Sequence, residues 1–356
     1  MPLIAGSVFD AHSAQFFNGY VEIENGIVVR VGKGASPKTP DMRGTVLPLF
    51  FNWHTHIADI IARQRICSSE RKWTVEELVG PGGEKHRILE ETRDAELVSA
   101  MRQAIWEMTH NGIGGFCDFR EGGLHGAGLL NTALANGRVR CIRLARPAQN
   151  VYGRKEIEAI LKVSDGIGAS SISDWDYSEL KKVARHAKKE GKKFAIHASE
   201  SVREDINLVL DLKPDLLVHM TQAGDSDFAA VADAGIPVVV CPSSSKFFRM
   251  RPPVDKMLAS GIRVKLGTDN AMIAALDMFE EIRELRSFSP VGFAEALNMC
   301  LVSNSDNIFN GKNYSFSPSE GAPPALMVLG RGGNCLTSAR SGDITGVFLE
   351  KCVWRK

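Results

Sequence analysis

The feature that most constrains this fold is a repeated alternation after Thr45, in which short apolar runs are separated by longer amphipathic segments. This pattern is typical of βα units, because parallel strands need a long crossover connection. The apolar runs are 46–53, 113–118, 139–145, 163–167, 193–197, 215–219, 236–241 and 263–268. Helical spacing lies between them, over 94–111, 178–190, 226–233 and 276–286. These units match the usual length of a (β/α)8 TIM barrel, about 250 residues, better than an open sheet.

The two ends of the chain differ from this pattern. Short strands broken by turns occupy 4–9, 19–23 and 26–31, and turn-separated strands return at 326–329 and 344–349. We therefore predict an α/β protein in which residues 46–314 form the barrel. Residues 1–45 and 315–356 are expected to form one small β-sandwich-like domain beside it.

Composition excludes several classes of protein. Lys and Arg number 43 and Asp and Glu 42, so the net charge of +1 does not favour a nucleic-acid partner. The seven cysteines contain no CxxC pair, which argues against a disulfide framework or a thiolate zinc site. No run approaches the ~20 apolar residues of a membrane helix, and the first residues do not resemble a signal peptide. We expect a cytoplasmic protein with a small-molecule partner and no membrane partner; a homo-oligomeric state is left open.

Polar side chains gather at the C-terminal ends of the predicted strands. His54 and His56 end the first run, His197 the fifth and His219 the sixth, and Asp269 directly follows the eighth. Catalytic groups of a TIM barrel come from these ends, so the five side chains should converge on one mouth. His54 and His56 project to the same face of an extended strand and can bind one ion, although an isolated HxH pair is more often structural.

Five ordered blocks resemble the metal-dependent amidohydrolase superfamily, in the branch of cytosine-, guanine- and adenosine-type deaminases, triazine chlorohydrolases and imidazolonepropionase. The blocks are 47–56, 196–200, 218–219, 240–245, and 267–269 together with 276–279. The resemblance implies one divalent metal ion, Zn²⁺ or alternatively Fe²⁺, held by His54, His56, His197 and Asp269. It also implies that His219 contacts the hydrolytic water or the substrate. Glu200, the glutamate of the HxxE string, would move protons.

This residue set explains a hydrolytic activity. A bound Zn²⁺ or Fe²⁺ can lower the pKa of its water to ~7 and so supply a metal-bound hydroxide at neutral pH. Asp269 can accept the proton of that water, Glu200 can protonate the leaving nitrogen, and His219 can stabilise the developing oxyanion. Taken singly, Glu200 could instead be a first-turn helix acid, Asp269 a helix N-cap and His219 a buried barrel histidine.

We therefore expect a hydrolase that cleaves a non-peptide C–N bond of a small cyclic substrate. Hydrolytic deamination of an amino-heterocycle is favoured. Ring opening of a cyclic amide, as in imidazolonepropionase, is the first alternative, and a metal-containing barrel that only binds its ligand is the second. Relatives in the resembled superfamily that bind two metal ions use a carboxylated lysine at the fourth strand. Lys162 precedes the end of the fourth predicted strand, so the resemblance implies one metal ion and not two.

Three residues are candidates for substrate binding. Arg120 follows the second run and can bind a carboxylate or carbonyl; pairing with Glu121 is the structural alternative. Asp59 lies just behind the HxH pair and could hold an amino group or be a solvated loop acid. Lys85 lies in a long insertion, 67–91, that should cap the barrel mouth, where it could close over the substrate or be exposed on the surface. Because Arg120 and Lys85 are cationic, a substrate with an anionic or carbonyl-rich edge is expected.

Overall fold

The protein is described by a computed structural model, which covers residues 2–135, 137–303, 318–330, 338–349 and 352–355. Its larger sheet has nine strands in the order β12-β11-β10-β9-β8-β7-β6-β5-β13, and every neighbouring pair is parallel. The strands are β5 (Phe50–His56), β6 (Ile113–Arg120), β7 (Arg140–Ala145), β8 (Gly166–Ala169), β9 (Lys193–Ala198), β10 (Leu216–His219), β11 (Val238–Val240), β12 (Val264–Leu266) and β13 (Asp269–Asn270).

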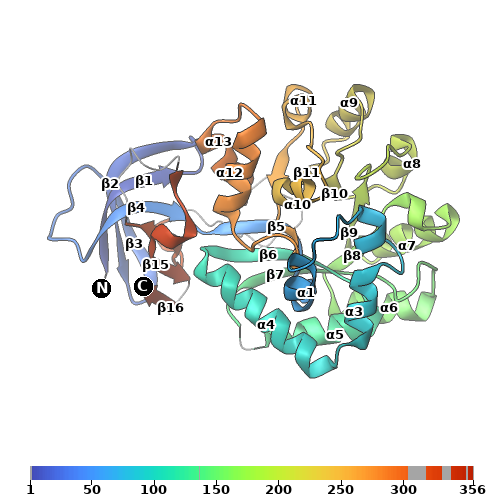
Figure 1. Cartoon of the computed structure of the whole chain (residues 1–356). Coiled ribbons are helices and arrows are strands. Elements are labelled where there is room, and N and C mark those ends of the chain that lie inside the picture. The colour runs from blue at the N-terminus through green and yellow to red at the C-terminus, as the bar shows by residue number, and fades with distance from the viewer. Residues whose placement is uncertain (1, 136, 304–317, 331–337, 350–351, 356) are drawn as a thin grey trace.

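The sheet curls back on itself. β13 follows β12 closely in the chain, yet it pairs with β5 at the other end of the strand order, so that Asp269 lies opposite Thr55. Helices surround the curled sheet, as Figure 1 shows. All residues of β6 and β10 are buried, because a parallel sheet is covered on both faces. The α/β class is confirmed, and the curled sheet is consistent with the predicted TIM-like barrel.

The helices connect these strands in the expected alternation. They are α4 (Asp94–His110), α5 (Gly123–Leu134), α6 (Arg154–Val163), α7 (Tyr177–Lys189), α8 (Ile206–Asp211), α9 (Asp225–Asp233), α10 (Pro242–Phe247), α11 (Val254–Ala259), α12 (Met278–Phe288) and α13 (Phe293–Met299). Short 3-10 turns lie at Ile57–Ala62, Ile172–Asp174 and Ser341–Asp343. Among the described residues, no helix combines the length and the apolar character needed to cross a bilayer.

Two predicted strands differ from the structure. The first run, 46–53, contains parts of two strands: β4 (Met42–Pro48) belongs to the smaller sheet, and only β5 lies in the curled sheet. A continuous apolar run cannot reveal this division, since both strands are buried. The fourth strand was expected at 163–167, but Val163 ends α6 and β8 begins at Gly166.

The smaller sheet joins both ends of the chain in the order β16-β15-β14-β4-β1-β2-β3. Its other strands are β1 (Leu3–Asp10), β2 (Gln15–Glu24), β3 (Ile27–Lys33), β14 (Ala325–Leu329), β15 (Ile344–Leu349) and β16 (Cys352–Arg355). β4 pairs with β1 on one side and with β14 on the other, so the N-terminal and C-terminal strands lie together in Figure 1. That this sheet is a separate domain stays a prediction, and its expected boundary at 314/315 lies outside the described residues.

The long insertion forms short helices near the C-terminal ends of the curled sheet. They are α2 (Val75–Val79) and α3 (Glu84–Glu91), and α1 (Arg63–Cys67) leads into the insertion. A capping box between Thr74 and Glu77 starts α2. Val79, Pro81 and Lys85 line the same hollow as His197 and His219. The insertion therefore forms part of the wall of the candidate site.

Candidate metal centre and active site

Five predicted side chains from four strands meet at the C-terminal end of the curled sheet. The ring centroid of His54 lies 4.9 Å from that of His56, 4.8 Å from that of His197 and 5.8 Å from that of His219. Asp269, on β13, completes the group because β13 pairs with the strand that carries His54 and His56. The cluster opens into a hollow of about 590 Å³.

The spacing of the ligand atoms fits one metal ion. Asp269 Oδ1 lies 3.2 Å from His54 Nε2 and 3.7 Å from His56 Nε2. Atoms bound at about 2.0–2.2 Å to one tetrahedral ion lie roughly 3.3–3.6 Å apart, which is close to this spacing. His54 and His197 also belong to a second convergent set, with His219, whose nitrogens lie within 4.8 Å of one another.

The imidazoles are prepared to act as ligands. His197 Nδ1 lies 2.8 Å from the carbonyl oxygen of Ala169, which only accepts, so Nδ1 carries the proton and Nε2 keeps a free lone pair. Burial lowers the pKa of His54, of His219 and of His197, and it lowers the pKa of His56 to about 4. The rings are therefore neutral at pH 7, the state that binds metal.

The surroundings of Asp269 favour its ionised form, and its backbone has a left-handed conformation. Burial acts to raise its pKa, but the hydrogen bond with His54 and the neighbouring imidazoles hold the pKa well below its usual value. Its second oxygen, Oδ2, accepts a hydrogen bond of 2.5 Å from Ser244 Oγ. Asp269 and His219 both adopt left-handed backbone angles, with φ of 57° and 74°. Such angles in non-glycine residues cluster at functional sites.

Glu200 lies beside this group without belonging to the set around His54. Its Oε2 lies 3.6 Å from His219 Nε2, and its side chain is 18% exposed to the hollow. Burial and the nearby Asp269 raise the pKa of Glu200 to about 8. Glu200 is therefore protonated at neutral pH and has a proton to give.

Glu281 supports the helix that carries Ser244. Its Oε2 accepts a hydrogen bond of 2.9 Å from the backbone N–H of Ser243, in the first turn of α10, while Oε1 is buried with no hydrogen-bond partner among the described residues. Burial raises the pKa of Glu281 to about 8, against a usual value of 4.5. Between these values the folded protein binds more protons than the unfolded chain, so this group lowers stability as pH rises.

Glu281→Gln is expected to remove this pH dependence. The glutamine keeps an acceptor for the N–H of Ser243 and is neutral at every pH. The free energy of unfolding of the variant minus that of the natural protein should increase by up to about 1.4 kcal/mol for each pH unit between pH 5 and 8. Urea unfolding at several pH values measures this. The same change at exposed Glu280, on the same helix, is the control, and equal pH profiles for the two variants would contradict the prediction.

The three predicted substrate contacts lie in a buried ion-pair network around Glu121. Lys85 Nζ lies 2.7 Å from Glu121 Oε1, and Arg120 Nη2 lies 2.8 Å from Glu121 Oε2. Asp59 is 0% exposed, 3.5 Å from Lys85 and 3.8 Å from Arg120. Arg146 adds a further contact to Glu121 at 3.4 Å. The network neutralises the cations that were expected to meet an anionic substrate.

These positions bear on the predicted substrate-binding roles of Asp59, Arg120 and Lys85. A second hollow, of about 530 Å³, adjoins the hollow of the histidines. Asp59 lines neither of them, so the geometry favours a structural role for Asp59. Arg120 adopts the pairing with Glu121 that was its structural alternative, and it lines only the adjoining hollow. Lys85 lines the hollow of the histidines. Substrate contacts by Arg120 and Lys85 stay predictions. Lys162 is exposed on α6, away from the cluster.

Sequence reasoning missed several functional neighbours. Glu121 Oε1 lies 3.5 Å from His56 Nδ1, where it can orient that ring. The ring centroid of Phe119 lies 4.4 Å from that of His54, so the Phe119 ring gives the histidine cluster an apolar neighbour. Ser244 is one of three consecutive serines, so the sequence pattern pointed to the segment but could not predict which serine contacts Asp269. Glu121 had a usable signal, since it follows a strand end directly.

Comparison with known proteins places this geometry in a family. Residues 45–300 match the sequence pattern of the Amidohydrolase family. A protein of Methanocaldococcus jannaschii described as uncharacterized is 34% identical over 284 residues, which cover 74% of this chain and 73% of that protein. A 5′-deoxyadenosine deaminase of Methanosarcina barkeri is 25% identical, over 79% of this chain and 72% of the relative. An imidazolonepropionase of Treponema denticola is 23% identical, over 71% of each.

Solved structures agree on the fold. The atrazine chlorohydrolase of Arthrobacter aurescens, crystallised with zinc, superposes with a TM-score of 0.76 at 15% identity, and the match covers 100% of this chain and 95% of that one. A likeness at this identity concerns the fold alone. The family match extends over most of the chain and includes every residue of the histidine and aspartate cluster. The chain therefore belongs to the metal-dependent amidohydrolase family and is a hydrolase that acts on C–N bonds.

Proposed function

We propose that this protein deaminates an amino-heterocycle by hydrolysis, with one divalent metal ion, Zn²⁺ in the first instance, held by His54, His56, His197 and Asp269. The observation that carries the proposal is that the imidazoles, the Asp269 carboxyl, whose pKa is lowered, and the Glu200 carboxyl, whose pKa is raised, meet in one cluster beside one hollow. The first two bind a cation. The third supplies the proton that a leaving amine needs.

The ion, when bound, supplies the Lewis acidity that makes water nucleophilic near neutral pH. Asp269 accepts the proton of the attacking water, and its hydrogen bond from Ser244 keeps the carboxylate oriented. Glu200 donates its proton to the ring nitrogen or the departing amine. His219, 3.6 Å from Glu200, donates a hydrogen bond to the oxygen on which negative charge develops.

Ring opening of a cyclic amide is the alternative, because the same acid and base would serve it and the relatives include an imidazolonepropionase. Deamination releases ammonia and ring opening does not. The zinc-loaded protein should therefore release ammonium from at least one amino-purine, amino-pyrimidine or amino-pterin in an enzyme-coupled assay. Loss of ring absorbance with lactams and no ammonium from any aminated ring would replace deamination by ring opening.

Metal analysis together with the hydrolysis panel separates both reactions from a protein that only binds its ligand. Near-stoichiometric metal together with hydrolysis supports the proposal. Near-stoichiometric metal, no hydrolysis across the panel and a ligand recovered unchanged from crystals would favour the binding function.

A further inference from the structure

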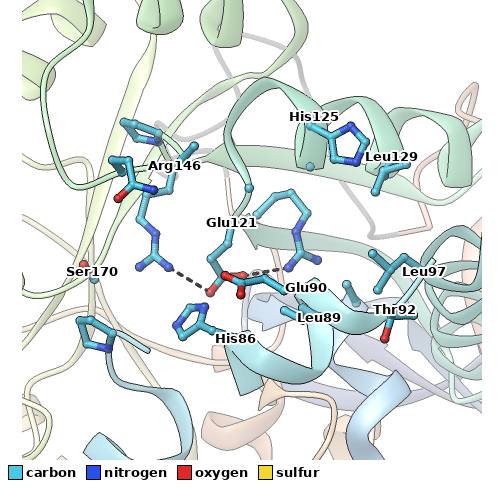
Figure 2. A pocket seen from close by; sticks show the side chains of 18 of the residues that line it. His86, Leu89, Glu90, Thr92, Leu97, Glu121, His125, Leu129, Arg146 and Ser170 are labelled. Carbon is cyan, nitrogen blue, oxygen red and sulfur yellow. Dashed lines mark hydrogen bonds and ion pairs between the residues drawn. The ribbon is translucent and has the colours of Figure 1, made fainter. Parts of the chain in front are cut away.

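A second hollow adjoins the one that holds the histidines. Its volume is about 530 Å³, close to the 590 Å³ of the first. The two share the lining residues Val79, Pro81, Glu121, Arg146, Ser170 and Asp174. Glu121 stands at this shared wall, where it pairs with Arg146, as Figure 2 shows, and with Arg120. None of the proposed metal ligands lines the second hollow, so it can receive only a part of a ligand that projects away from the reacting ring.

Four apolar side chains line one side of this hollow, beside the polar Thr92 and His125. Leu89 comes from α3, Leu97 and Met101 from α4, and Leu129 from α5. Figure 2 shows Leu97 and Leu129 on the side of the hollow away from Arg146, with Leu89 nearer to Glu121. Leu97 and Met101 are buried and also line this hollow. Apolar surface of this kind, in a concave site with a few polar groups, is suited to an apolar ligand group.

The charges in the hollow disfavour an anion. Both arginines of its lining, Arg120 and Arg146, are already paired with Glu121. Glu90 and Asp174 also line it, and neither forms an ion pair with another described residue. A carboxylate entering this space would therefore meet acids without a free cation to receive it. An uncharged group could bind there without breaking the ion pairs that Arg120 and Arg146 form with Glu121.

We propose that the second hollow is a substrate subsite for an uncharged, largely apolar substituent carried by the ring that reacts at the metal centre. The inference rests on the proposed function for the position of the ring, and it adds the class of substrate: a ring with an apolar arm. It replaces the earlier expectation of an anionic substrate edge, which depended on cations that the structure pairs with Glu121.

Three sets of probes test this subsite on the full-length zinc-loaded protein. Adenine, guanine and cytosine serve as bare rings. Their derivatives with a hexyl group on a ring nitrogen carry an apolar arm, and those with a 5-carboxypentyl group on the same ring nitrogen carry an arm with an acidic end, so the exocyclic amine can still leave as ammonia. Affinity is measured by calorimetry and turnover by ammonium release. The hexyl arm should improve the affinity of at least one ring by about tenfold, and the acidic end should abolish most of this gain.

Variants tie the gain to this hollow. Leu129→Trp and, separately, Leu89→Trp fill it, and each should reduce the ratio of hexyl to bare-ring affinity by about fivefold or more. Leu124→Trp is the matched control: Leu124 lies on the same helix as Leu129 but is 46% exposed, so the ratio should not change. Circular dichroism verifies that each variant is folded, and two filling variants guard against the misfolding of one.

The outcomes separate this inference from the proposed function. An unchanged ratio in both filling variants, no gain from any hexyl arm, or tightest binding of the acidic arm would overturn the subsite. Binding of a hexyl probe that depends on Leu129, with no hydrolysis of any ring, would keep the subsite and overturn deamination. Ammonium release from bare rings without any effect of the arm would do the reverse.

Discussion

Glu200→Gln is expected to retain the metal and to lose about 10²- to 10⁴-fold in kcat, the usual contribution of a general acid. The carboxyl of Glu200 lies beside His219, and the raised pKa of about 8 keeps its proton available at neutral pH. Glutamine has nearly the same size but cannot transfer that proton. Steady-state kinetics, with the metal content of the same sample measured by mass spectrometry, give both quantities.

Two comparisons make this result specific. His54→Ala and His197→Ala should lose the ion itself, since each removes a proposed ligand. Glu204→Gln is the matched control in the same hollow: its carboxylate accepts hydrogen bonds of 2.8 Å from Ser199 N–H and 3.1 Å from Ser173 N–H, so it is not free for proton transfer. Release of the metal by Glu200→Gln would make Glu200 a ligand, an arrangement that its proximity to His219 and Asp269 permits.

The order of strands and helices could be predicted from the sequence because each strand of a parallel sheet is a short apolar run between amphipathic helices. The limits of the strands could not. Residues 46–53 form one apolar run, but Pro48 ends a strand of the smaller sheet and Phe50 begins a strand of the curled sheet. Hydrophobicity reports burial, and both strands are buried. Only the pairing of β4 with β1 and with β14, which lies nearly 280 residues later in the chain, separates them.

The meeting of the histidines and Asp269 could be predicted because it follows from topology: parallel strands end at one edge of the sheet, so residues at strand ends meet. Their assignment as metal ligands came from the family resemblance and stays a prediction. The surrounding network could not be predicted in this way. Glu121 is bound by Lys85 from α3 and by Arg146 from beyond β7, and no periodicity in the sequence relates these positions. The positive charge of Arg120 and Lys85 therefore suggested substrate contacts, whereas in the structure these side chains form ion pairs with Glu121.

Arg120→Met is accordingly expected to destabilise the protein. Arg120 is 4% exposed and lies 2.8 Å from Glu121, 3.8 Å from Asp59 and 4.0 Å from Asp118. Removing one partner from a buried set of charges leaves the others uncompensated and typically lowers stability by about 3–5 kcal/mol. The midpoint of urea unfolding at pH 8, compared with that of the natural protein, measures the loss.

The pH dependence identifies the cause. Burial raises the pKa of Asp59 to about 7 and that of Asp118 to about 6, and the charge of Arg120 opposes both shifts. At pH 5 the two carboxyls are protonated in the folded protein and need no cation, so the destabilisation should be smaller at pH 5 than at pH 8. Arg146→Met is the control, because Arg146 is more exposed and contacts Glu121 at 3.4 Å; a loss of about 1 kcal/mol or less is expected. If Arg120→Met instead unfolds like the natural protein and weakens the binding of a carboxylated ligand, Arg120 is a substrate contact and not part of the scaffold.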